Sequence, residues 1–279
     1  MREYILYSSY ISTGGLRILN VEQMTVVEIA KLLEENNLSI AIINSLKQDS
    51  RVSVSRLFTK WQKRQEQNLL EKQRIQGLYK QERMLAAKGY NLIAGVDEAG
   101  RGPLAGPLVV GAVILPIGCH LPSINDSKKL SVKQREYLYH EIKEVAISVQ
   151  HIVIDIDVID HLNIYNATIS GMYEAINELH QRPHAVLIDA VPLPDLEMHS
   201  LSLIGGDAIS ASIGAASIIA KVERDNLMRE YDKQFPQYGF AKHKGYGTAE
   251  HLKALQQFGP CPIHRRSFEP IKSWGRIEI

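Results

Sequence analysis

Apolar positions in the second half of the chain alternate between short β-branched runs and longer stretches with a helical period. The β-branched runs predict strands at residues 92–97, 108–115, 151–156, 185–189 and 201–204. The longer stretches predict helices at residues 131–146, 164–180 and 209–235, and the pattern Ser131-x-x-Gln134 caps the first of them. An initial hairpin followed by alternating strands and helices predicts an α/β domain with a mixed sheet.

The first part of the chain has a different texture. Thr25-x-x-Glu28 is a capping box that opens a short helix at Met24. Residues 52–88 contain no proline and mix Leu and Trp with many Lys, Arg and Gln, which predicts a long basic amphipathic helix. This helix could lie on a duplex, but we favour a linker role. We therefore expect a helical N-terminal region over residues 1–90 and a second domain over residues 91–279.

Residues 1–23 show no clear period. We therefore hypothesise that translation starts at Met24. Mass spectrometry of the native N-terminus would test this.

Composition excludes several classes of protein. Cys119 and Cys261 lie far apart and match no zinc spacing, which favours a reducing, cytoplasmic compartment. The longest apolar stretch, residues 104–117, is too short to cross a bilayer, so we expect no membrane insertion. The ten histidines form no H-x-x-x-H pattern, so a zinc hydrolase is not expected.

The net charge of +1 conceals a strong segregation of charge. Residues 51–90 carry a net +7, residues 91–220 carry −8, and residues 221–279 carry +4. Solvated helix faces could produce such a pattern. An acidic centre between basic flanks is also what a carboxylate site needs when its substrate is a polyanion.

Four acids stand at the ends of predicted elements. Asp97 and Glu98 end one strand, Asp189 ends another, and Asp207 precedes the longest helix of this part of the chain. Two carboxylates about 4 Å apart repel by roughly 4 kcal/mol at an effective dielectric near 20, so such a cluster requires cations. Oxygen ligands without paired His or Cys select Mg²⁺ or Mn²⁺, and two such ions can support hydrolysis of a phosphodiester.

The turn after Glu98 reads Gly100-Arg101-Gly102, a bare backbone that a ligand can approach closely. Its next glycine, Gly106, comes one residue too late for a dinucleotide fingerprint, and no P-loop motif occurs in the chain. Three other acids, Asp155, Asp157 and Asp160, could compete as metal ligands. In the run HIVIDIDVID the first two share one face of a predicted strand, and we interpret all three as solvated.

Five motifs together resemble bacterial ribonuclease HII. They are GVDEAGRGPLAGPLVVGAVIL, DSKKLS at 126–131, GDAISASIGAASIIAKVERD at 206–225, HKGYGT at 243–248 and HRRSF at 264–268. The resemblance runs in order over residues 92–268, and the segment before it resembles an extension found in some members. It implies a ribonuclease H-like mixed sheet flanked by helices. The chain departs from the family at Ala190-Val191, where many members have Gly-Asn, and at Gly214, where alanine is commoner.

The resemblance also implies an activity. The family enzyme hydrolyses the RNA strand of RNA–DNA hybrids and incises 5′ of ribonucleotides embedded in duplex DNA, leaving 3′-hydroxyl and 5′-phosphate ends. Such an activity would serve DNA replication and ribonucleotide excision repair. We expect it to act as a monomer.

The family roles can be carried over residue by residue. They make Asp97, Glu98, Asp189 and Asp207 catalytic ligands of Mn²⁺ or Mg²⁺. The backbone of Gly100, Arg101 and Gly102 would recognise the ribose 2′-hydroxyl, and Tyr246 would stack on the sugar. Nearby cations are candidates for phosphate contact, namely Lys128, Lys129, Lys221, Arg224, Arg265 and Arg266.

Two alternatives stay open. A ribonuclease HIII-like enzyme would cut long hybrids but not a lone ribonucleotide, although its turn usually reads Gly-Lys-Gly. A non-catalytic nucleic-acid-binding protein would be consistent with the basic flanks. The four acids argue against the latter, because they would weaken binding to a polyanion unless metal ions occupied them.

Overall fold

The computed structural model describes residues 20–35 and 38–274, and the chain divides into two compact units, Met1–Leu70 and Glu71–Ile279. Most of the segment proposed to precede the start codon lies outside the described residues. The first unit contains η2 (Val21–Gln23), α1 (Val26–Leu32), α2 (Ile40–Gln48) and most of α3 (Val52–Leu78). No helix of the described ranges is long and apolar enough to cross a membrane.

Capping side chains define the helices of the N-terminal unit. The predicted box is confirmed, because Thr25 Oγ1 accepts from the Glu28 amide while the Glu28 carboxylate accepts from the Thr25 amide. Ser39 caps α2 with its side chain alone, which accepts from the Ile42 amide. Apolar side chains from all three helices close a small core, which contains Val21, Ile29, Leu33, Leu46, Val54 and Phe58.

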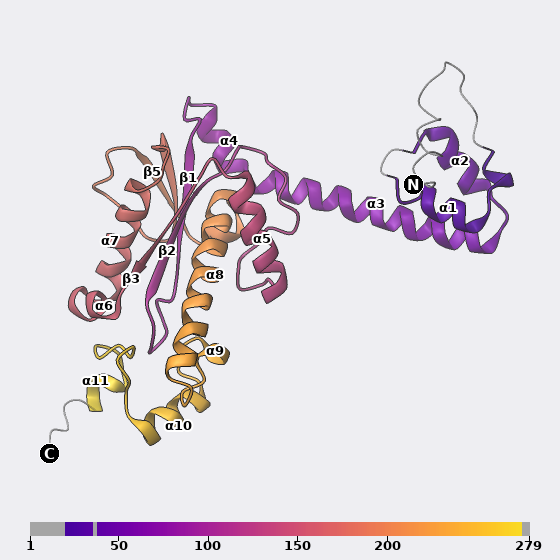
Figure 1. The fold of residues 1–279 in the computed structure, drawn as a ribbon. Helices are drawn as coiled ribbons and strands as arrows, with labels where there is room; N and C mark the ends of the chain where they lie inside the picture. Colours follow the sequence, from indigo (N-terminus) through magenta and orange to yellow (C-terminus); the bar gives the residue numbers. More distant parts are fainter. Residues whose placement is uncertain (1–19, 36–37, 275–279) are drawn as a thin grey trace, which may run out of the picture. The chain divides into compact units, whose positions relative to one another are not determined.

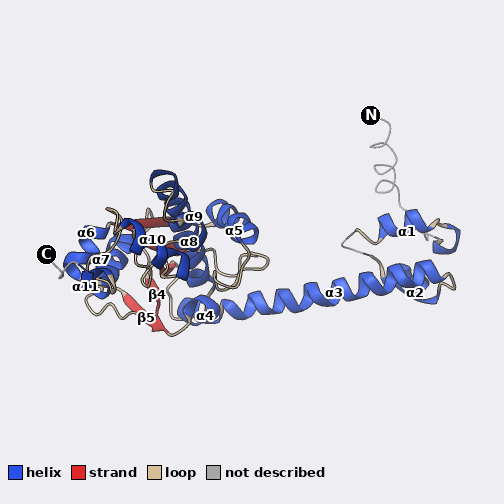
Figure 2. Cartoon of the chain, turned by 90° about the horizontal axis from the view of Figure 1, so that it is seen from below, coloured by secondary structure: helices blue, strands red, loops and turns tan. Residues whose placement is uncertain are grey.

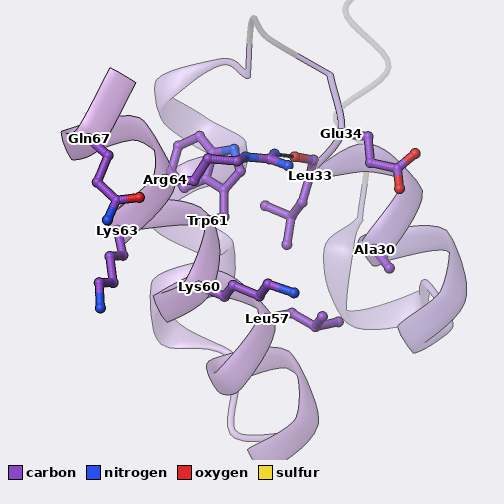
Figure 3. Close-up of a pocket in the computed structure, with 9 residues that line it drawn as sticks. All are labelled: Ala30, Leu33, Glu34, Leu57, Lys60, Trp61, Lys63, Arg64 and Gln67. Atoms are coloured by element: carbon purple, nitrogen blue, oxygen red, sulfur yellow. Dashed lines mark hydrogen bonds between the residues drawn. The ribbon is translucent and has the colours of Figure 1, made fainter. Parts of the chain in front are cut away.

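A pocket of about 400 Å³ lies between α1 and α3 of this unit (Figure 3). Leu33 and Trp61 line it, and Phe58 stacks on Trp61 with ring centroids 5.6 Å apart. Lys60 and Lys63 are exposed at its edge. Only one carboxylate lines this pocket, so it does not match the predicted four-carboxylate site.

The second unit is built on one mixed sheet. Its strands are β1 (Ile93–Ala99), β2 (Leu108–Ile114), β3 (Ser148–Ile154), β4 (Ala185–Asp189) and β5 (His199–Leu203), in the spatial order β3-β2-β1-β4-β5. The first three strands form antiparallel pairs, whereas β4 lies parallel to both β1 and β5. The predicted mixed sheet flanked by helices is therefore confirmed.

Helices cover both faces of the sheet. The helices of the second unit are α4 (Lys80–Ala86), α5 (Val132–Val145), α6 (Ile156–Leu162), α7 (Ile164–Asn177), α8 (Ala211–Gln234), α9 (Phe240–His243), α10 (Ala249–Phe258) and α11 (Ile271–Trp274). Figures 1 and 2 show α6 and α7 on one face, α5 and α8 on the other, and α9 to α11 gathered at one end. The capping box predicted at Ser131 is present at the start of α5.

Glycine allows α8 to lie directly on the sheet. A Cβ atom at Gly95 of β1 would stand 2.0 Å from the Ser212 carbonyl carbon, and one at Gly111 of β2 would stand 2.4 Å from the Ala216 oxygen. No side chain fits in such a space, so the two backbones touch. The opposite face of the sheet packs on α7 through a larger apolar core that includes Val96, Val110 and Met172.

The predicted helix over residues 52–88 is interrupted at Tyr79, whose φ of −89° and ψ of 15° depart from helical values and whose side chain packs against the sheet domain. Tyr79 is 1% exposed, and its hydroxyl lies 2.9 Å from Cys119 Sγ. Within α4, Glu82 is also 1% exposed and accepts hydrogen bonds from the Ser210 hydroxyl at 2.7 Å and the Ser212 amide at 3.0 Å. The second unit thus begins at Glu71. The functional boundary near residue 90 remains a proposal.

One predicted strand was placed wrongly. β3 ends at Ile154, and Asp155 is the first capping position of α6, so Asp155 and Asp157 do not share a strand face. The strand ends there because its pairing with β2 stops at the pair Leu108 and Ile154. Asp160 is not simply solvated either, because it accepts hydrogen bonds from the Arg266 amide at 2.8 Å and the Ser267 amide at 3.0 Å.

Candidate active site

The parallel pairing of β1 and β4 brings two predicted ligands to one edge of the sheet. Val96 lies opposite Ile188 in this register, so Asp97 and Asp189 follow in the next row. Side chains alternate along a strand, which places Asp97 on the same face as Gly95, the face covered by α8. Two carboxylates from distant parts of the sequence therefore become neighbours at the carboxyl ends of parallel strands.

Asp97 is buried, with 4% of its surface exposed. Its Oδ1 accepts the Glu98 amide proton at 2.7 Å. Burial is the largest cause that raises the pKa of Asp97 well above its usual range, and the charges of Glu98 and Asp189 add to it, while the Ser217 hydroxyl on α8 opposes it. The ionised form is thus strongly disfavoured unless positive charge is supplied.

Glu98 has one engaged and one unsatisfied oxygen. Oε1 lies 3.4 Å from a guanidinium nitrogen of Arg101, whose side chain is 39% exposed. Oε2 is buried and has no hydrogen-bond partner in the part of the chain that the structure describes. Burial raises the pKa of Glu98, the Arg101 charge lowers it, and Asp189 raises it. An unpartnered buried carboxylate oxygen is unfavourable, and a cation would satisfy it.

The third and fourth predicted acids, Asp189 and Asp207, lie near the short helix η3 that precedes α8. Asp189 Oδ1 accepts the Gly206 amide proton at 2.7 Å. Asp207 lies in η3 (Gly206–Ala208) and is 7% exposed. Burial raises the pKa of Asp207, and the charges of Asp126 and Asp189 raise it further, whereas Lys128 lowers it. All four predicted acids therefore belong to one electrostatically coupled region.

Lys128 lies within the field of these carboxylates. Burial alone would lower its pKa, but Asp207, Asp97 and Asp126 outweigh burial and raise it. The Lys128 amide also donates to Asp126 Oδ1 at 2.9 Å, which fixes the loop that carries both residues. The next residue, Lys129, points its ammonium toward Asp126 at 3.8 Å and remains mostly exposed.

These carboxylates fit divalent cations by their chemistry. They supply hard oxygen donors, they are buried, they raise one another's pKa values, and one of their oxygens lacks a partner. Within residues 20–35 and 38–274, no three His, Cys, Asp or Glu side chains are already arranged as a group that could hold an ion. The fit therefore rests on the donor set and its electrostatics.

A cleft of about 440 Å³ joins one of the four acids, Glu98, to the glycine turn. Glu98, Lys128, Lys221 and Tyr246 line it together with the Gly100-Arg101-Gly102 segment. Tyr246 is 47% exposed, and its Cε1 would stand 3.8 Å from a Cβ placed on Gly102. The structure thus brings Tyr246 and the glycine turn together, with the ring outside the core.

Two buried arginines hold the glycine turn and the segment that follows it. Arg224 is 1% exposed and donates to the carbonyls of Pro107, Lys244 and Ala105 at 2.9, 3.0 and 3.1 Å. A Cβ on Gly100, which has a φ of 104°, would collide with its guanidinium. Carbonyl oxygens engage three of its five N–H groups and the side chain is buried, so the structure does not support the phosphate contact predicted for Arg224.

Arg265 also donates to carbonyl oxygens, and the phosphate contact predicted for it is likewise not supported. It is fully buried, and its guanidinium donates to the carbonyls of Gly100 at 2.6 Å, Arg101 at 3.0 Å and Gly106 at 2.8 Å. Arg266, in contrast, is exposed. Lys221 lines the cleft but pairs with Asp225 at 2.6 Å.

Sequence reasoning missed three members of the region, namely Asp126, Ser127 and Ser217. Ser127 and Ser217 share a hydrogen bond of 2.9 Å, and both are buried. A short polar side chain in a loop or in an Ala-rich helix carries no periodic signal. Only the motif DSKKLS pointed toward Asp126 and Ser127.

Family models and known proteins match this chain over most of its length. The family model described as Ribonuclease HII matches residues 94–271, and the model for the Ribonuclease HII N-terminal domain matches residues 25–86. The ribonuclease HII of Desulfitobacterium hafniense (strain DSM 10664 / DCB-2) is 48% identical over 252 residues, 90% of this chain and 96% of the relative. That of Bacillus velezensis is 46% identical and covers 90% of this chain and 98% of the relative.

Solved structures agree with the fold. Ribonuclease H2 from Pyrococcus horikoshii covers 65% of this chain and 96% of its own, with 26% identity and a TM-score of 0.56. The RNase HII of Archaeoglobus fulgidus, solved in a complex with PCNA, covers 64% of this chain and 95% of its own, with 25% identity and a TM-score of 0.54. On these family matches and identities, the chain belongs to the ribonuclease HII family.

Proposed function

We propose that the enzyme uses its carboxylate region to incise duplex DNA on the 5′ side of an embedded ribonucleotide and to cut RNA–DNA hybrids, leaving 3′-hydroxyl and 5′-phosphate ends. As a ribonuclease HII, the chain is an endoribonuclease that degrades RNA in RNA–DNA hybrids. The cleavage position and the roles of the residues go beyond this family assignment. One observation carries it, the cleft that joins Glu98 to the Gly100-Arg101-Gly102 turn and Tyr246.

Mn²⁺ or Mg²⁺ would be held by the oxygens of Asp97, Glu98, Asp189 and Asp207. When bound, such an ion polarises the phosphoryl group and lowers the pKa of the attacking water. The chain contributes the rest of the site. Burial of Asp97 excludes competing water from its oxygens, and the Gly206 amide fixes one oxygen of Asp189.

Recognition of ribose follows from the glycine turn. Arg265 fixes the direction of the peptide groups at Gly100 and Arg101, and Gly102 leaves the backbone open to a ligand. The 2′-hydroxyl is the group that separates RNA from DNA. A rigid turn of accessible peptide groups next to the carboxylates can therefore select the sugar that lies beside the bond to be cut.

Substrate placement would also use the exposed ring and the lysines of the cleft. Tyr246 presents an exposed ring beside Gly102, where it can stack on a sugar. Lys128 and Lys221 line the same cleft and can meet phosphates, although each also has a carboxylate neighbour. Their contribution to affinity should decrease as salt increases.

The test uses two substrates, a DNA duplex with one ribonucleotide and a continuous RNA–DNA hybrid, each with Mn²⁺ or Mg²⁺. We expect incision of both by the wild type, no incision by Asp97→Asn, and wild-type rates for Asp157→Asn, whose acid is exposed on α6. Cleavage of the hybrid alone would favour a ribonuclease HIII-like enzyme. Cleavage of neither substrate would favour a non-catalytic nucleic-acid-binding protein.

A second readout separates metal binding from activity. A ligand that binds only the folded state raises the melting temperature. Mn²⁺ should therefore raise the melting temperature of the wild type and of Asp157→Asn, and should raise that of Asp97→Asn much less. Equal shifts in all three proteins would refute the ligand role of Asp97.

Tyr246 is tested by comparison with another exposed tyrosine. Tyr246→Ala should weaken incision at a lone ribonucleotide more than cleavage of a continuous hybrid, while Tyr246→Phe keeps the ring and should behave like the wild type. Tyr137→Ala on α5, where the tyrosine is 55% exposed, is the control. Equal losses on both substrates in Tyr246→Ala would count against stacking.

We further propose that the enzyme is a monomer of the cytoplasm. The two cysteines are both free thiols in the structure, which suits a reducing compartment. Sedimentation of the purified chain would test the first statement, and cell fractionation would test the second.

A further inference from the structure

A cluster of three buried histidines and one half-buried cysteine lies behind Tyr246 and takes no part in the proposed chemistry. His251 and His264 are 0% and 1% exposed, and His243 is 8% exposed. The rings of His243 and His251 stack with centroids 4.4 Å apart. Cys261 approaches the cluster with its thiol 3.1 Å from His264 Nδ1. These residues come from α9, α10 and the loop that follows.

The hydrogen bonds of the cluster run in one direction. The Cys261 amide donates to His264 Nδ1 at 2.9 Å, closer than the Cys261 carbonyl at 3.3 Å, so this nitrogen is an acceptor. Neutral His264 then carries its proton on Nε2 and donates to His251 Nε2 at 3.0 Å. His251 must therefore carry its proton on Nδ1, which donates to the Tyr246 carbonyl at 2.9 Å.

A second anchor holds the same loop from the other side. The Gly245 amide donates to His243 Nδ1 at 3.2 Å, so His243 carries its proton on Nε2 and donates to the Tyr238 carbonyl at 2.7 Å. All six ring nitrogens of the three histidines thus have a partner. Lys244 and Gly245 both have positive φ values, 54° and 83°. A loop in this conformation needs such contacts, since Lys244 is strained there.

The loop that carries Lys244, Gly245 and Tyr246 is bonded to residues next to the glycine turn. The Gly245 carbonyl accepts the Leu104 amide proton at 2.8 Å, and the Lys244 carbonyl accepts from Arg224 at 3.0 Å. Motion of the Tyr246 backbone would therefore change both the position of the ring and its spacing from Gly102.

We propose that His264 and His251 form a one-way hydrogen-bond chain that positions Tyr246, which makes them positioning residues for discrimination between a lone ribonucleotide and a continuous hybrid. The inference rests on the proposed stacking role of Tyr246. A lone ribonucleotide offers one sugar step to recognise, so it depends on a correctly placed ring. A continuous hybrid offers many registers for binding, so its cleavage tolerates a misplaced ring.

The chain works only with neutral imidazoles. A proton added to His264 would place an N–H against the Cys261 amide, and one added to His251 would face the Nε2–H of His264. Burial and the neighbouring histidines together lower the pKa of His251 to about 4 and the pKa of His264 to about 4, and they outweigh the backbone hydrogen bonds that raise both. Both rings are therefore neutral where the enzyme works, and the direction of the chain is fixed.

One experiment reads the tautomers in the wild-type chain. Long-range ¹H–¹⁵N correlation spectra of ¹⁵N-histidine-labelled protein at pH 7 should show His251 protonated on Nδ1, and His264 and His243 protonated on Nε2. Assignment uses the single His→Phe variants. Finding His251 protonated on Nε2, or charged, would overturn the proposal without any use of activity.

The second experiment measures KM and kcat on the two substrates. His251→Phe keeps a ring but loses the donor to Tyr246, and we expect its KM for the single-ribonucleotide duplex to rise about tenfold, the effect of losing roughly 1.4 kcal/mol. Its kcat, and both constants on the continuous hybrid, should change less than twofold. His251→Asn keeps an N–H near the position of Nδ1 and should restore most of the KM.

The controls separate this inference from the proposed function. His140→Phe, on the exposed side of α5, should match the wild type on both substrates. If Tyr246→Ala loses discrimination but His251→Phe does not, the chain does not position the ring and the inference fails. If Tyr246→Ala keeps discrimination, the stacking role fails and the inference falls with it. Equal losses in His251→Phe and His251→Asn on both substrates would show a scaffold role only, which also overturns it.

Discussion

The guanidinium of Arg265 donates a hydrogen bond to the carbonyl oxygen of Gly100 at 2.6 Å, across 165 positions of sequence. The same side chain reaches Arg101 and Gly106, so one buried cation gathers three carbonyls of the turn beside the carboxylates. The C-terminal segment of the chain therefore sets the shape of the turn that follows β1.

We expect Arg265→Lys to destabilise the protein by about 3 kcal/mol, because hydrogen bonds to a charged donor contribute about 1.5–3 kcal/mol each and lysine cannot make all of them. Urea denaturation measures this. Arg266→Lys is the matched control, since its side chain is exposed, and it should change stability by less than about 0.5 kcal/mol. Equal stability of the two variants would show that the carbonyl contacts do not hold the turn.

Ala190 follows Asp189 with a φ of 54°, in the left-handed region that glycine prefers. A non-glycine residue there is strained by about 1 kcal/mol, partly offset by the greater chain entropy of glycine. Ala190→Gly should therefore raise the free energy of unfolding by a few tenths to about 1 kcal/mol. Ala87→Gly, at an exposed position with helical φ, should lower it by a similar amount. A loss in both variants would contradict the strain.

Truncation should show whether the folded domain begins at Glu71, as the compact unit does, or near residue 90, as the sequence predicts. A chain that begins at Glu71 keeps Ile75, Tyr79 and Glu82 and should unfold cooperatively. A chain that begins at Gly89 loses them, and each buried large apolar side chain contributes about 2–5 kcal/mol, so we expect it to be unfolded or aggregated. Circular dichroism during heating measures both. Comparable cooperative unfolding of the two chains would show that α4 is not part of the domain.

Stability should depend on pH through His251 and His264. Burial lowers the pKa of each to about 4, against about 6.5 in an unfolded chain, so the unfolded state binds more protons between these values. Their contribution is present above about pH 6.5 and is lost as pH falls through about 4.

This pH effect is best measured as a difference between the wild type and His251→Phe in urea. Asp97 and Asp207 have raised pKa values, so they change stability in the opposite direction as pH falls, and the subtraction removes them. The wild type should lose more stability than His251→Phe between pH 6.5 and 4. Parallel curves would show that His251 is not buried as a neutral ring.

The sequence alone determined the local elements and the chemical type of the site. Capping boxes at Thr25 and Ser131 depend on residues three positions apart, so they could be read directly, and they are present. The strands around Asp97 and Asp189 were also predicted within two residues, because β-branched runs bounded by turns are a local signal. The four acids were chosen as candidates because they end predicted elements.

Only the tertiary structure decided what depends on contacts between distant segments. The register of β2 with β3 ended a strand at Ile154 and made Asp155 a helix cap. Burial turned Arg224 and Arg265 from candidate phosphate ligands into supports of the glycine turn. The chain from Cys261 to Tyr246 has no sequence signature, because hydrogen-bond direction is set by the position of each partner in space. Local patterns fix which residues are present at an edge, whereas burial and long-range pairing decide what each of them does.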